Sequence, residues 1–496
     1  MVSAKRLIGA TAVLLTWTLS LTACSVGGHD SDSDLVVGVT LEPPTLDLTM
    51  SDAAGIPQVL LYNVYETLVR MGDDGEIEPL LATSYELLDD GLTYQFDLDP
   101  EARFTSGTVV DAAAVKASID LMSQGTSKLV TAAMEQIESV SVVDADTVAI
   151  RLKQPSNFWL YSMTSTPGVI FDPAINDLAN TPMGSGPYTV ESWTKGDRIT
   201  LMRNDSYWAA QPQFKQVSFR YIPDPNAMVS AMLSGGIDVM AEMTSPDALG
   251  QFDDANRFTI SSGTTNGEIV MGFNHDRPAL QDLRVRQAIA YAIDRQALVD
   301  ATWGGQGQVI GSMSVPTDPY YQDLTGIYPY DPAKARTLLA SAGVADLQLA
   351  LRIPITPYGG PAANDIATHL AEVGITVTVE ELDFSSRWLP EVYTDGDYDM
   401  TIVAHVEARD IVNFANPDYY WHYRNPEFAD LIDQADHGSS GDFVPTMEQA
   451  ARLLADDAAA EFLFVFPNLV VCRSGIIGIP RNATSLSFDV SRISAA

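Results

Sequence analysis

The sequence predicts an α/β protein, because segments typical of strands and of helices are interspersed along the chain. Residues 92–98 alternate apolar and polar side chains, which is typical of a half-buried strand. Residues 284–303 place apolar side chains at helical spacing with charged side chains opposite, which predicts an amphipathic helix. A helical stretch that reaches Val373 is followed by Gly374 and by an alternating segment from residue 375, which indicates a helix leading into a strand. This mixture argues against a β-sandwich or a helical bundle.

Further elements follow from local rules, in chain order. The apolar run 35–40 predicts a strand. The stretches on either side of residues 144–146 (Asp-Ala-Asp) predict a hairpin. A helix is expected to begin at Pro332, with Asp331 as its N-cap, and to end at Gly343.

Composition excludes several classes of protein. Of the 496 residues, 46% are hydrophobic and 19% are charged, which rules out a disordered, collagen-like or disulfide-stapled chain. This length suggests about two to four domains. Asp and Glu number 65 against 28 Lys and Arg, for a net charge of −37. Because so acidic a chain repels phosphate backbones, we expect no nucleic-acid partner.

The N-terminus has the pattern of an export signal. A Lys-Arg pair at positions 5–6 precedes the apolar run 7–21, which is shorter than the roughly 20 residues that span a bilayer. The motif Leu-Thr-Ala-Cys that ends at Cys24 is similar to the bacterial lipobox, which implies cleavage before Cys24 and a diacylglyceryl group on its sulfur. We expect a signal peptide over 1–23, a flexible tether over 24–34 and lipid anchoring on the extracytoplasmic face of the cell membrane. An ordinary signal peptide is the alternative.

The sequence offers no motif for covalent, hydride or phosphoryl chemistry. The segment 184–186 (Gly-Ser-Gly) lacks the glycine two residues before the serine that a nucleophile elbow needs. A P-loop, H-E-x-x-H and C-x-x-C are absent, and the six histidines include no pair at i, i+4. Cys472 lies in an apolar run, so we expect a buried strand residue without a disulfide partner. We therefore expect a protein that is not an enzyme, with no catalytic residues, metal or cofactor.

Several motifs occur in a fixed order along most of the chain. They are 44–47 (PTLD), 64–68 (VYETL), 75–82 (GEIEPLLA), 91–96 (GLTYQF), 184–188 (GSGPY), 203–208 (RNDSYW), 236–238 (GID), 282–294 (DLRVRQAIAYAID) and 338–343 (LLASAG). Together, and behind a lipobox, they resemble the family 5 extracellular solute-binding proteins of ABC importers, the oligopeptide- and dipeptide-binding type. The resemblance covers roughly residues 35–490.

The resemblance implies a two-lobed fold of the periplasmic-binding-protein type II kind, with an extra subdomain on the first lobe. The expected boundaries are 35–60, 183–273 and 470–496 for the first lobe, 61–182 for its subdomain, and 274–469 for the second lobe. The chain would cross between the lobes near 271–274 and 465–471. The implied function is capture of a solute by hinge closure and delivery to permease subunits, by a monomer that meets the membrane only through its lipid.

The resemblance also suggests residues that contact the ligand. In the peptide-binding members an acidic residue, within a Trp-x-x-Asp segment and seven residues before an aromatic, pairs with the ligand's α-ammonium. In the matching stretch 404–414, Glu407 takes the acidic position and Ala404 stands where Trp would be, so one wall of the usual pocket is missing. The other expected ligand-binding residues are Ser51, Asp52 and Ala53 from the first lobe and His405, Arg409, Asn413 and Trp421 from the second.

Each of these residues also has a structural interpretation. Trp421 could belong to the core, and Arg409 could simply pair with Asp410. His405 could indicate a metal-chelate ligand, although a lone histidine is more often hydrogen-bonded structure. The expected ligand is therefore a peptide or another amine-bearing solute, with a metal chelate, an opine or a short glycan as alternatives. A surface hydrolase or an adhesin on the same scaffold is a further alternative, which the missing nucleophile motif disfavours.

Overall fold

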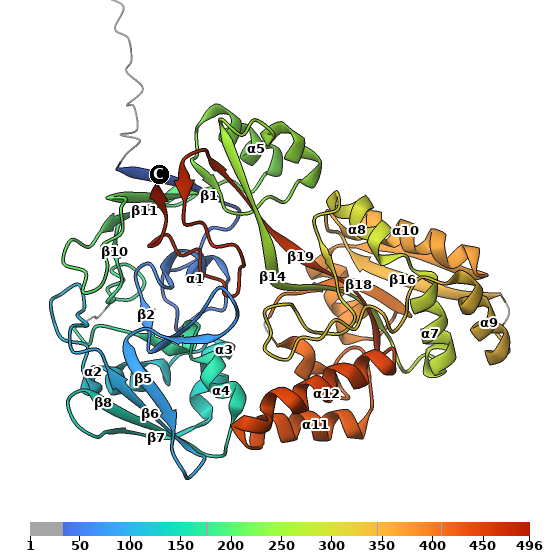
Figure 1. Ribbon diagram of the computed structural model, residues 1–496, viewed down its shortest axis with the longest axis horizontal. Coiled ribbons are helices and arrows are strands. Elements are labelled where there is room, and N and C mark those ends of the chain that lie inside the picture. Colours follow the sequence, from blue (N-terminus) through green and yellow to red (C-terminus); the bar gives the residue numbers. More distant parts are fainter. Residues whose placement is uncertain (1–32, 175–176, 345, 408) are drawn as a thin grey trace, which may run out of the picture.

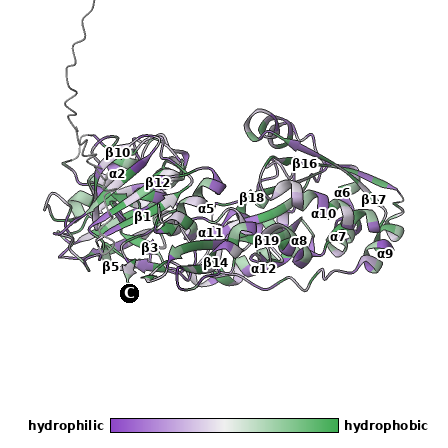
Figure 2. Ribbon diagram, turned by 90° about the horizontal axis from the view of Figure 1, so that it is seen from above, coloured by the Kyte–Doolittle hydropathy of each residue, from purple (hydrophilic) through white to green (hydrophobic). Residues whose placement is uncertain are grey.

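The computed structural model describes residues 33–174, 177–344, 346–407 and 409–496; the expected signal peptide, Cys24 and nearly all of the tether lie outside these ranges. Two bodies, here called the first and the second lobe, are joined by the long strands β14 (Phe258–Phe273) and β19 (Ala460–Arg473) (Figure 1). Seen from above, the lobes lie side by side along the long axis of the molecule (Figure 2).

The first lobe is built on a sheet in which β1 pairs in parallel with β12 and with β13. Its strands, in spatial order, are β10 (Tyr188–Thr194), β11 (Arg198–Arg203), β12 (Gln216–Tyr221), β1 (Asp34–Val39) and β13 (Val239–Met240). Helix α1 (Gly55–Leu60) is wholly buried, and α5 (Pro225–Ser234) follows β12. The predicted strand at 35–40 is confirmed as β1, whose apolar side chains are buried on both faces.

A four-stranded antiparallel sheet extends the first lobe. Its order is β5 (Ala82–Leu87), β6 (Thr93–Leu98), β8 (Thr147–Leu152) and β7 (Ile137–Val142), so the predicted strand at 92–98 and the predicted hairpin are confirmed. The helices α2 (Ala112–Met122), α3 (Lys128–Glu135) and α4 (Asn157–Ser162) begin at the N-caps Asp111, Ser127 and Ser156. The apolar residues of this sheet share one core with the rest of the first lobe.

Short strands complete the first lobe. They are β2 (Glu66–Thr67) with β9 (Val169–Ile170), β3 (Val69–Met71) with β4 (Ile77–Pro79), and β20 (Ile476–Ile477) with β21 (Ser494–Ala495). The chain therefore returns to the first lobe after β19, and its C-terminal segment packs beside the strands near the N-terminus (Figure 1).

The second lobe continues the same sheet through the distal halves of β14 and β19. Its other strands are β18 (Met400–His405), β16 (Leu347–Pro354) and β17 (Ile375–Leu382), with β15 (Gln308–Val309) beside β19. One face is covered by α7 (Leu283–Ala292), α8 (Arg295–Trp303), α9 (Pro332–Ala342) and α10 (Gly359–Glu372), and the other by α11 (Pro426–His437) and α12 (Phe443–Asp456). Alternate residues of β14 supply these two cores, with Ile269 and Met271 on one side and Val270 on the other.

Local signals placed both ends of α9 correctly but failed for the stretch 284–303. Helix α9 begins after Asp331, whose carboxylate accepts from Lys334 N, and ends at Gly343 in the left-handed conformation. The expected single helix over 284–303 is wrong, because the chain is extended at Ile293 and a new N-cap, Asp294, starts α8. The helical spacing continued across that break, which is why periodicity alone did not reveal it.

The strands that link the lobes cross earlier on β14 than expected. Residues 258–264 of β14 pair with 467–473 of β19 in the first lobe, and residues 268–273 pair with β18 in the second. The register between β14 and β19 shifts between Thr264 and Glu268. The crossing on β14 therefore lies at 264–268, and the expectation of 271–274 is corrected. On β19 the same point falls at 465–467.

Two further features concern Cys472 and the length of the helices. Cys472 is buried on β19 with 1% of its surface exposed, which confirms the predicted strand residue. Within the described ranges, no helix is both long and apolar enough to cross a bilayer.

Arg286 on α7 generates the first prediction. This buried guanidinium donates to the carbonyl oxygens of Leu280, Gln281, Asp457 and Ala458 at 2.8–3.2 Å. Arg286→Met leaves these oxygens without a donor, so we expect the free energy of unfolding in urea to fall by about 3 kcal/mol.

The matched control is the neighbouring Arg284, which is exposed and pairs with Asp282. Arg284→Met is expected to change the stability by less than about 0.5 kcal/mol. Equal losses in the two variants would contradict the role given to Arg286.

Candidate interlobe binding site

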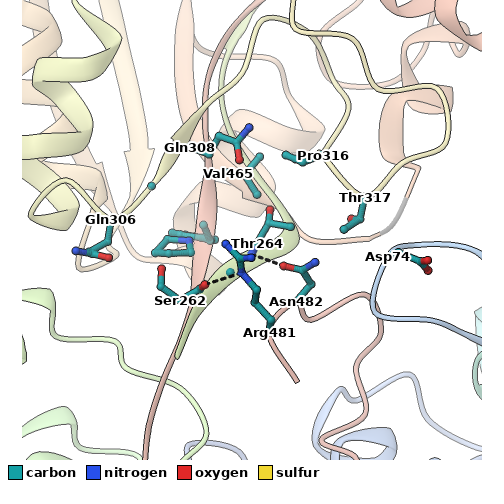
Figure 3. A pocket seen from close by; sticks show the side chains of 14 residues that line it. Asp74, Ser262, Thr264, Gln306, Gln308, Pro316, Thr317, Val465, Arg481 and Asn482 are labelled. Atoms are coloured by element: carbon teal, nitrogen blue, oxygen red, sulfur yellow. Dashed lines mark hydrogen bonds between the residues drawn. The ribbon is translucent and has the colours of Figure 1, made fainter. Parts of the chain in front are cut away.

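A polar cavity of about 500 Å³ lies where the two lobes meet beside β14 and β19 (Figure 3). The strands supply Ser262, Gly263, Thr264, Val465, Phe466 and Pro467, the second lobe supplies Gln306, Gly307, Gln308, Pro316 and Thr317, and the first lobe supplies Asp74, Arg481 and Asn482. This volume is in the range of small-ligand sites, which is about 300–1,000 Å³. A lining rich in amide, hydroxyl and charged groups suits a solute that forms hydrogen bonds.

Hydrogen bonds to the crossing strands position the first-lobe wall of the cavity. Asn482 accepts from Thr264 N at 3.0 Å and donates to Asp73 O at 2.9 Å, and Arg481 donates to Ser262 O at 3.2 Å (Figure 3). Arg481 has no carboxylate within 4.0 Å among the described residues. The cavity thus presents a cation, Arg481, and an anion, Asp74, on the side of the first lobe.

A group of charged residues, here called the acidic cluster, lies next to this cavity. It consists of Glu268, Asp318 and Asp410, and Asp318 directly follows the cavity residue Thr317. Burial and then the charges of Asp410 and Asp318 raise the pKa of Glu268 well above its usual value. Burial likewise raises the pKa of Asp318 to about 6. Ionising the carboxyl groups of this cluster therefore costs free energy in the folded protein.

His405 connects the acidic cluster to the aromatic core of the second lobe. It lies opposite Glu268 in the β14–β18 ladder. Its Nδ1 is 3.2 Å from Asp410 Oδ2, and its Nε2 is 3.0 Å from the hydroxyl of Tyr420. Burial raises the pKa of Asp410, although the imidazole beside it acts in the opposite direction. Both ring nitrogens of His405 are thus engaged within the second lobe.

Arg409 reaches across to the first lobe. Its guanidinium lies 3.8 Å from the ring centre of Tyr161, on α4, and 5.4 Å from that of Phe443. Its backbone has φ 63°, a left-handed conformation that is uncommon outside glycine. An ion pair with Asp410 is not formed within 4.0 Å, so the stacking on Tyr161 is the main contact of this side chain.

A second interlobe contact joins the start of α4 to the end of α11, which lie side by side in Figure 1. Asp436 accepts from Ser156 Oγ at 2.7 Å and from Phe158 N at 3.1 Å. Asn157 donates to Ala435 O at 2.7 Å, and Gln154 Nε2 is 3.0 Å from His437 Nε2. The two lobes are therefore held together by direct contacts far from the crossing strands.

The ligand-binding residues expected from the first lobe make structural contacts with their own loop, the start of α3 and the core. Asp52 accepts from Lys128 N at 2.9 Å, from Leu129 N at 3.2 Å and from the Ser127 hydroxyl, so it caps α3. Burial alone would raise the pKa of Asp52, but these hydrogen bonds outweigh it and the pKa is lowered. Ser51 accepts from Ala53 N at 3.2 Å, and Ala53 packs against the core of the first lobe.

The residues expected from the second lobe lie in three environments. Glu407 is exposed and close enough to raise the pKa of Asp410. Asn413 is half-buried on the 3-10 helix Asp410–Ala415. Trp421 is 1% exposed and stacks on Phe414, with ring centres 3.9 Å apart, inside the core of the second lobe. The structure thus brings Glu407, His405 and Arg409 together around the acidic cluster.

Sequence reasoning missed Glu268, Asp318 and Tyr161. A signal for Glu268 was present, because a single carboxylate precedes the apolar segment 269–271. Its burial depends on strands that pair with it from more than 130 residues away, at His405 and Val465. Within the part of the chain that the structure describes, no group of three or more His, Cys, Asp or Glu is arranged to hold a metal ion.

Comparisons with known proteins agree with this architecture. The model of the bacterial extracellular solute-binding proteins, family 5 (middle region), matches residues 76–428. The glutathione-binding protein GsiB of Salmonella paratyphi A is 29% identical over 63% of this chain and 62% of its own length. A Brucella ovis protein named as an ABC transporter peptide-binding protein is 30% identical over 65% and 64%. The chain thus matches less than two thirds of the length of these relatives.

Solved structures share the fold over almost the whole chain. CtaP of Listeria monocytogenes superimposes with a TM-score of 0.82 at 21% identity, covering 94% of this chain and 99% of CtaP. NikA of Brucella suis, solved with Fe(III)-EDTA, gives 0.80 at 24% identity, covering 94% and 100%. The predicted α/β, two-lobed fold of the periplasmic-binding-protein type II kind is confirmed.

The contact between α4 and α11 generates the second prediction. Asp436→Ala removes two hydrogen bonds between the lobes, each worth about 1 kcal/mol. The population ratio of separated to joined lobes should therefore rise about tenfold or more. Small-angle scattering of the ligand-free protein should show a larger radius of gyration.

Asp430→Ala is the matched control, because Asp430 is exposed on the same helix and makes no side-chain hydrogen bond or ion pair with another described residue. We expect this variant to scatter like the native protein. An unchanged radius of gyration for Asp436→Ala would mean that the contact does not hold the lobes together.

Proposed function

The chain belongs to the bacterial extracellular solute-binding proteins of family 5, and we propose that it captures a peptide or a related amine-bearing solute for an ABC importer. Members of this family are extracytoplasmic transport proteins that deliver a solute to permease subunits. The observation that carries the proposal is the polar cavity between two lobes joined by only two crossing strands. Rotation of the lobes about those strands would enclose a solute and present a changed shape to the permease.

The energetics of capture are compatible with this site. A micromolar dissociation constant corresponds to about −8 kcal/mol. Backbone hydrogen bonds and ordered water can supply much of that energy in a polar cavity. The contacts of Arg409 and Asp436 with the first lobe would stabilise the closed arrangement of the lobes. The ligand then needs to supply only the rest of the free energy that favours the closed over the open arrangement.

The class of solute is proposed from the charges near the site. Glu407 is an exposed carboxylate beside the acidic cluster, and a ligand ammonium there would form short charge-assisted hydrogen bonds. Relatives carry names that refer to peptides and to glutathione, which both have a free amine. Solved structures with this fold hold agropinic acid in AgaA and Fe(III)-EDTA in NikA, so an opine or a metal chelate is the alternative.

Lipid anchoring forms part of the proposal and rests on the motif at Cys24. Cys24→Ala should abolish metabolic labelling by fatty acid and move the protein to the soluble or secreted fraction, because the acylated sulfur is lost. The native chain processed in the same cells is the control. Unchanged membrane retention would contradict the lipobox interpretation.

The amine site is tested with a free-amine peptide recovered from the gently purified protein and identified by mass spectrometry. Glu407→Gln keeps the shape and removes the charge, so calorimetry should show binding weakened more than about tenfold. Acetylating the peptide's amine should weaken binding to the native protein by a similar factor. Scattering with the unmodified peptide should show the lobes closing.

Combining Glu407→Gln with the acetylated peptide should cost clearly less than the sum of the separate losses, because both changes remove the same interaction. Additive losses, or no loss from Glu407→Gln, would place the amine elsewhere. Recovery of a non-peptide solute would favour the opine or chelate alternative.

A further inference from the structure

Glu268 is a buried carboxylate without a cation of its own. It is 3% exposed, its Oε2 atom has no hydrogen-bond partner among the described residues, and no basic group of that set lies within 4.0 Å of it. Glu461, on the adjacent strand β19, is equally buried but lies 3.6 Å from Arg295. Glu461 therefore has a protein cation beside it, and Glu268 has none within 4.0 Å among the described residues.

The groups that face Glu268 make the shortage of positive charge worse. Asp410, Asp318 and Glu407 all act on it as like charges. Arg409 is stacked on Tyr161 and makes no ion pair within 4.0 Å with a described carboxylate, although its charge acts on Asp318.

The remaining neighbours of Glu268 supply little positive charge. His405, opposite Glu268 in the ladder, is engaged by Asp410 and by the Tyr420 hydroxyl. Tyr161 and Tyr320 are coupled electrostatically to Glu268, and burial raises the pKa of both, so they stay neutral. Negative groups thus outnumber positive ones around this strand.

The position of Glu268 is as informative as its charge. It lies at the residue where β14 enters the second lobe, and it acts electrostatically on Tyr161 of the first lobe. Thr264, four residues earlier, and Thr317, beside Asp318, line the interlobe cavity. Val465, which pairs with Glu268 in the β14–β19 ladder, also lines the cavity, so Glu268 lies next to the lining although it is not part of it.

We propose that Glu268, together with Asp318 and Asp410, binds a positively charged side group of the solute, an ammonium or a guanidinium. An unpaired carboxylate is tolerated in a buried place only when a cation or several donors replace its water. The geometry thus narrows the solute class, on the basis of the proposed function, to basic peptides and related amines. This subsite lies beside Glu407, which would hold the terminal amine.

The binding test uses Ala-Arg-Ala and Ala-citrulline-Ala, which have nearly the same shape and differ by one positive charge. Agmatine is a third, non-peptide probe. Calorimetry on the native protein should show Ala-Arg-Ala binding at least about tenfold more tightly than Ala-citrulline-Ala. Glu268→Gln should reduce that ratio to less than about threefold and leave the affinity for Ala-citrulline-Ala unchanged.

Two variants separate this proposal from the more general one. Glu461→Gln removes a buried carboxylate from the same lobe, and it should keep the preference for arginine. Glu407→Gln should weaken both peptides by the same factor, because both carry a terminal amine. If both peptides bind equally to the native protein, the subsite is overturned and the peptide proposal stands. If agmatine alone binds and depends on Glu268, the subsite stands and the peptide proposal fails. If neither basic probe binds, the subsite is overturned.

A measurement without ligand provides a second check. A carboxyl whose pKa is raised by folding destabilises the folded state increasingly as the pH rises above its unfolded value, which is about 4.3. Glutamine cannot ionise, so Glu268→Gln should raise the melting temperature of the ligand-free protein more at pH 8 than at pH 5. A melting temperature lowered equally at both values would show that Glu268 is structural and would overturn the proposal.

Discussion

The pairing of β14 with β19 is the constraint on which the rest of the structure depends. These strands belong to both lobes at once, and one apolar cluster that includes Val36 of the first lobe and Ile269 of the second continues along them. The cavity lies beside them, and Glu268 and Val465 occupy the residues where they enter the second lobe. The pairing of these strands therefore determines the shape of the space available to a solute between the lobes.

Buried charged groups have different partners inside the second lobe and at the interface between the lobes. In the second lobe, the buried guanidinium of Arg286 donates to four carbonyl oxygens. At the interface between the lobes, Glu268 and the guanidinium of Arg409 are left without an ion-pair partner among the described residues. An unpaired carboxylate is expensive to bury, so the position of Glu268 between the lobes is the basis for proposing that a ligand cation completes it.

Local signals predicted several elements of the fold, whereas the two-lobed arrangement was implied by the resemblance to a family. The N-cap at Asp331 and the left-handed Gly343 defined α9, and the alternation from residue 92 defined β6. The break at Ile293 was missed because apolar spacing continues on both sides of it. The structural interpretation of Trp421 as a core residue was open from the sequence, and its stacking on Phe414 agrees with it.

The candidate site was predictable only in part, because its residues meet through long-range pairing. Glu407 and Arg409 come from one loop, and a motif could point to that loop. The burial of Glu268 depends on β18 and β19, and the role of Asp52 depends on Ser127, 75 residues away. Contacts between residues far apart in the sequence leave no local pattern, whereas helix caps and strand alternation do.

The register shift between Thr264 and Glu268 has a mechanical consequence. Three residues of β14, 265–267, lie between paired positions that are separated by a single residue on β19, at position 466. Across the crossing, β14 therefore has two more residues than β19, as in a β-bulge. Residues 265–267 are held by side-chain hydrogen bonds, since Thr265 donates to Phe466 O at 3.0 Å and Asn266 donates to Thr484 O at 3.1 Å. Rotation of the lobes would therefore be taken up in this segment, at the cost of these bonds, while the ladders on either side stay intact.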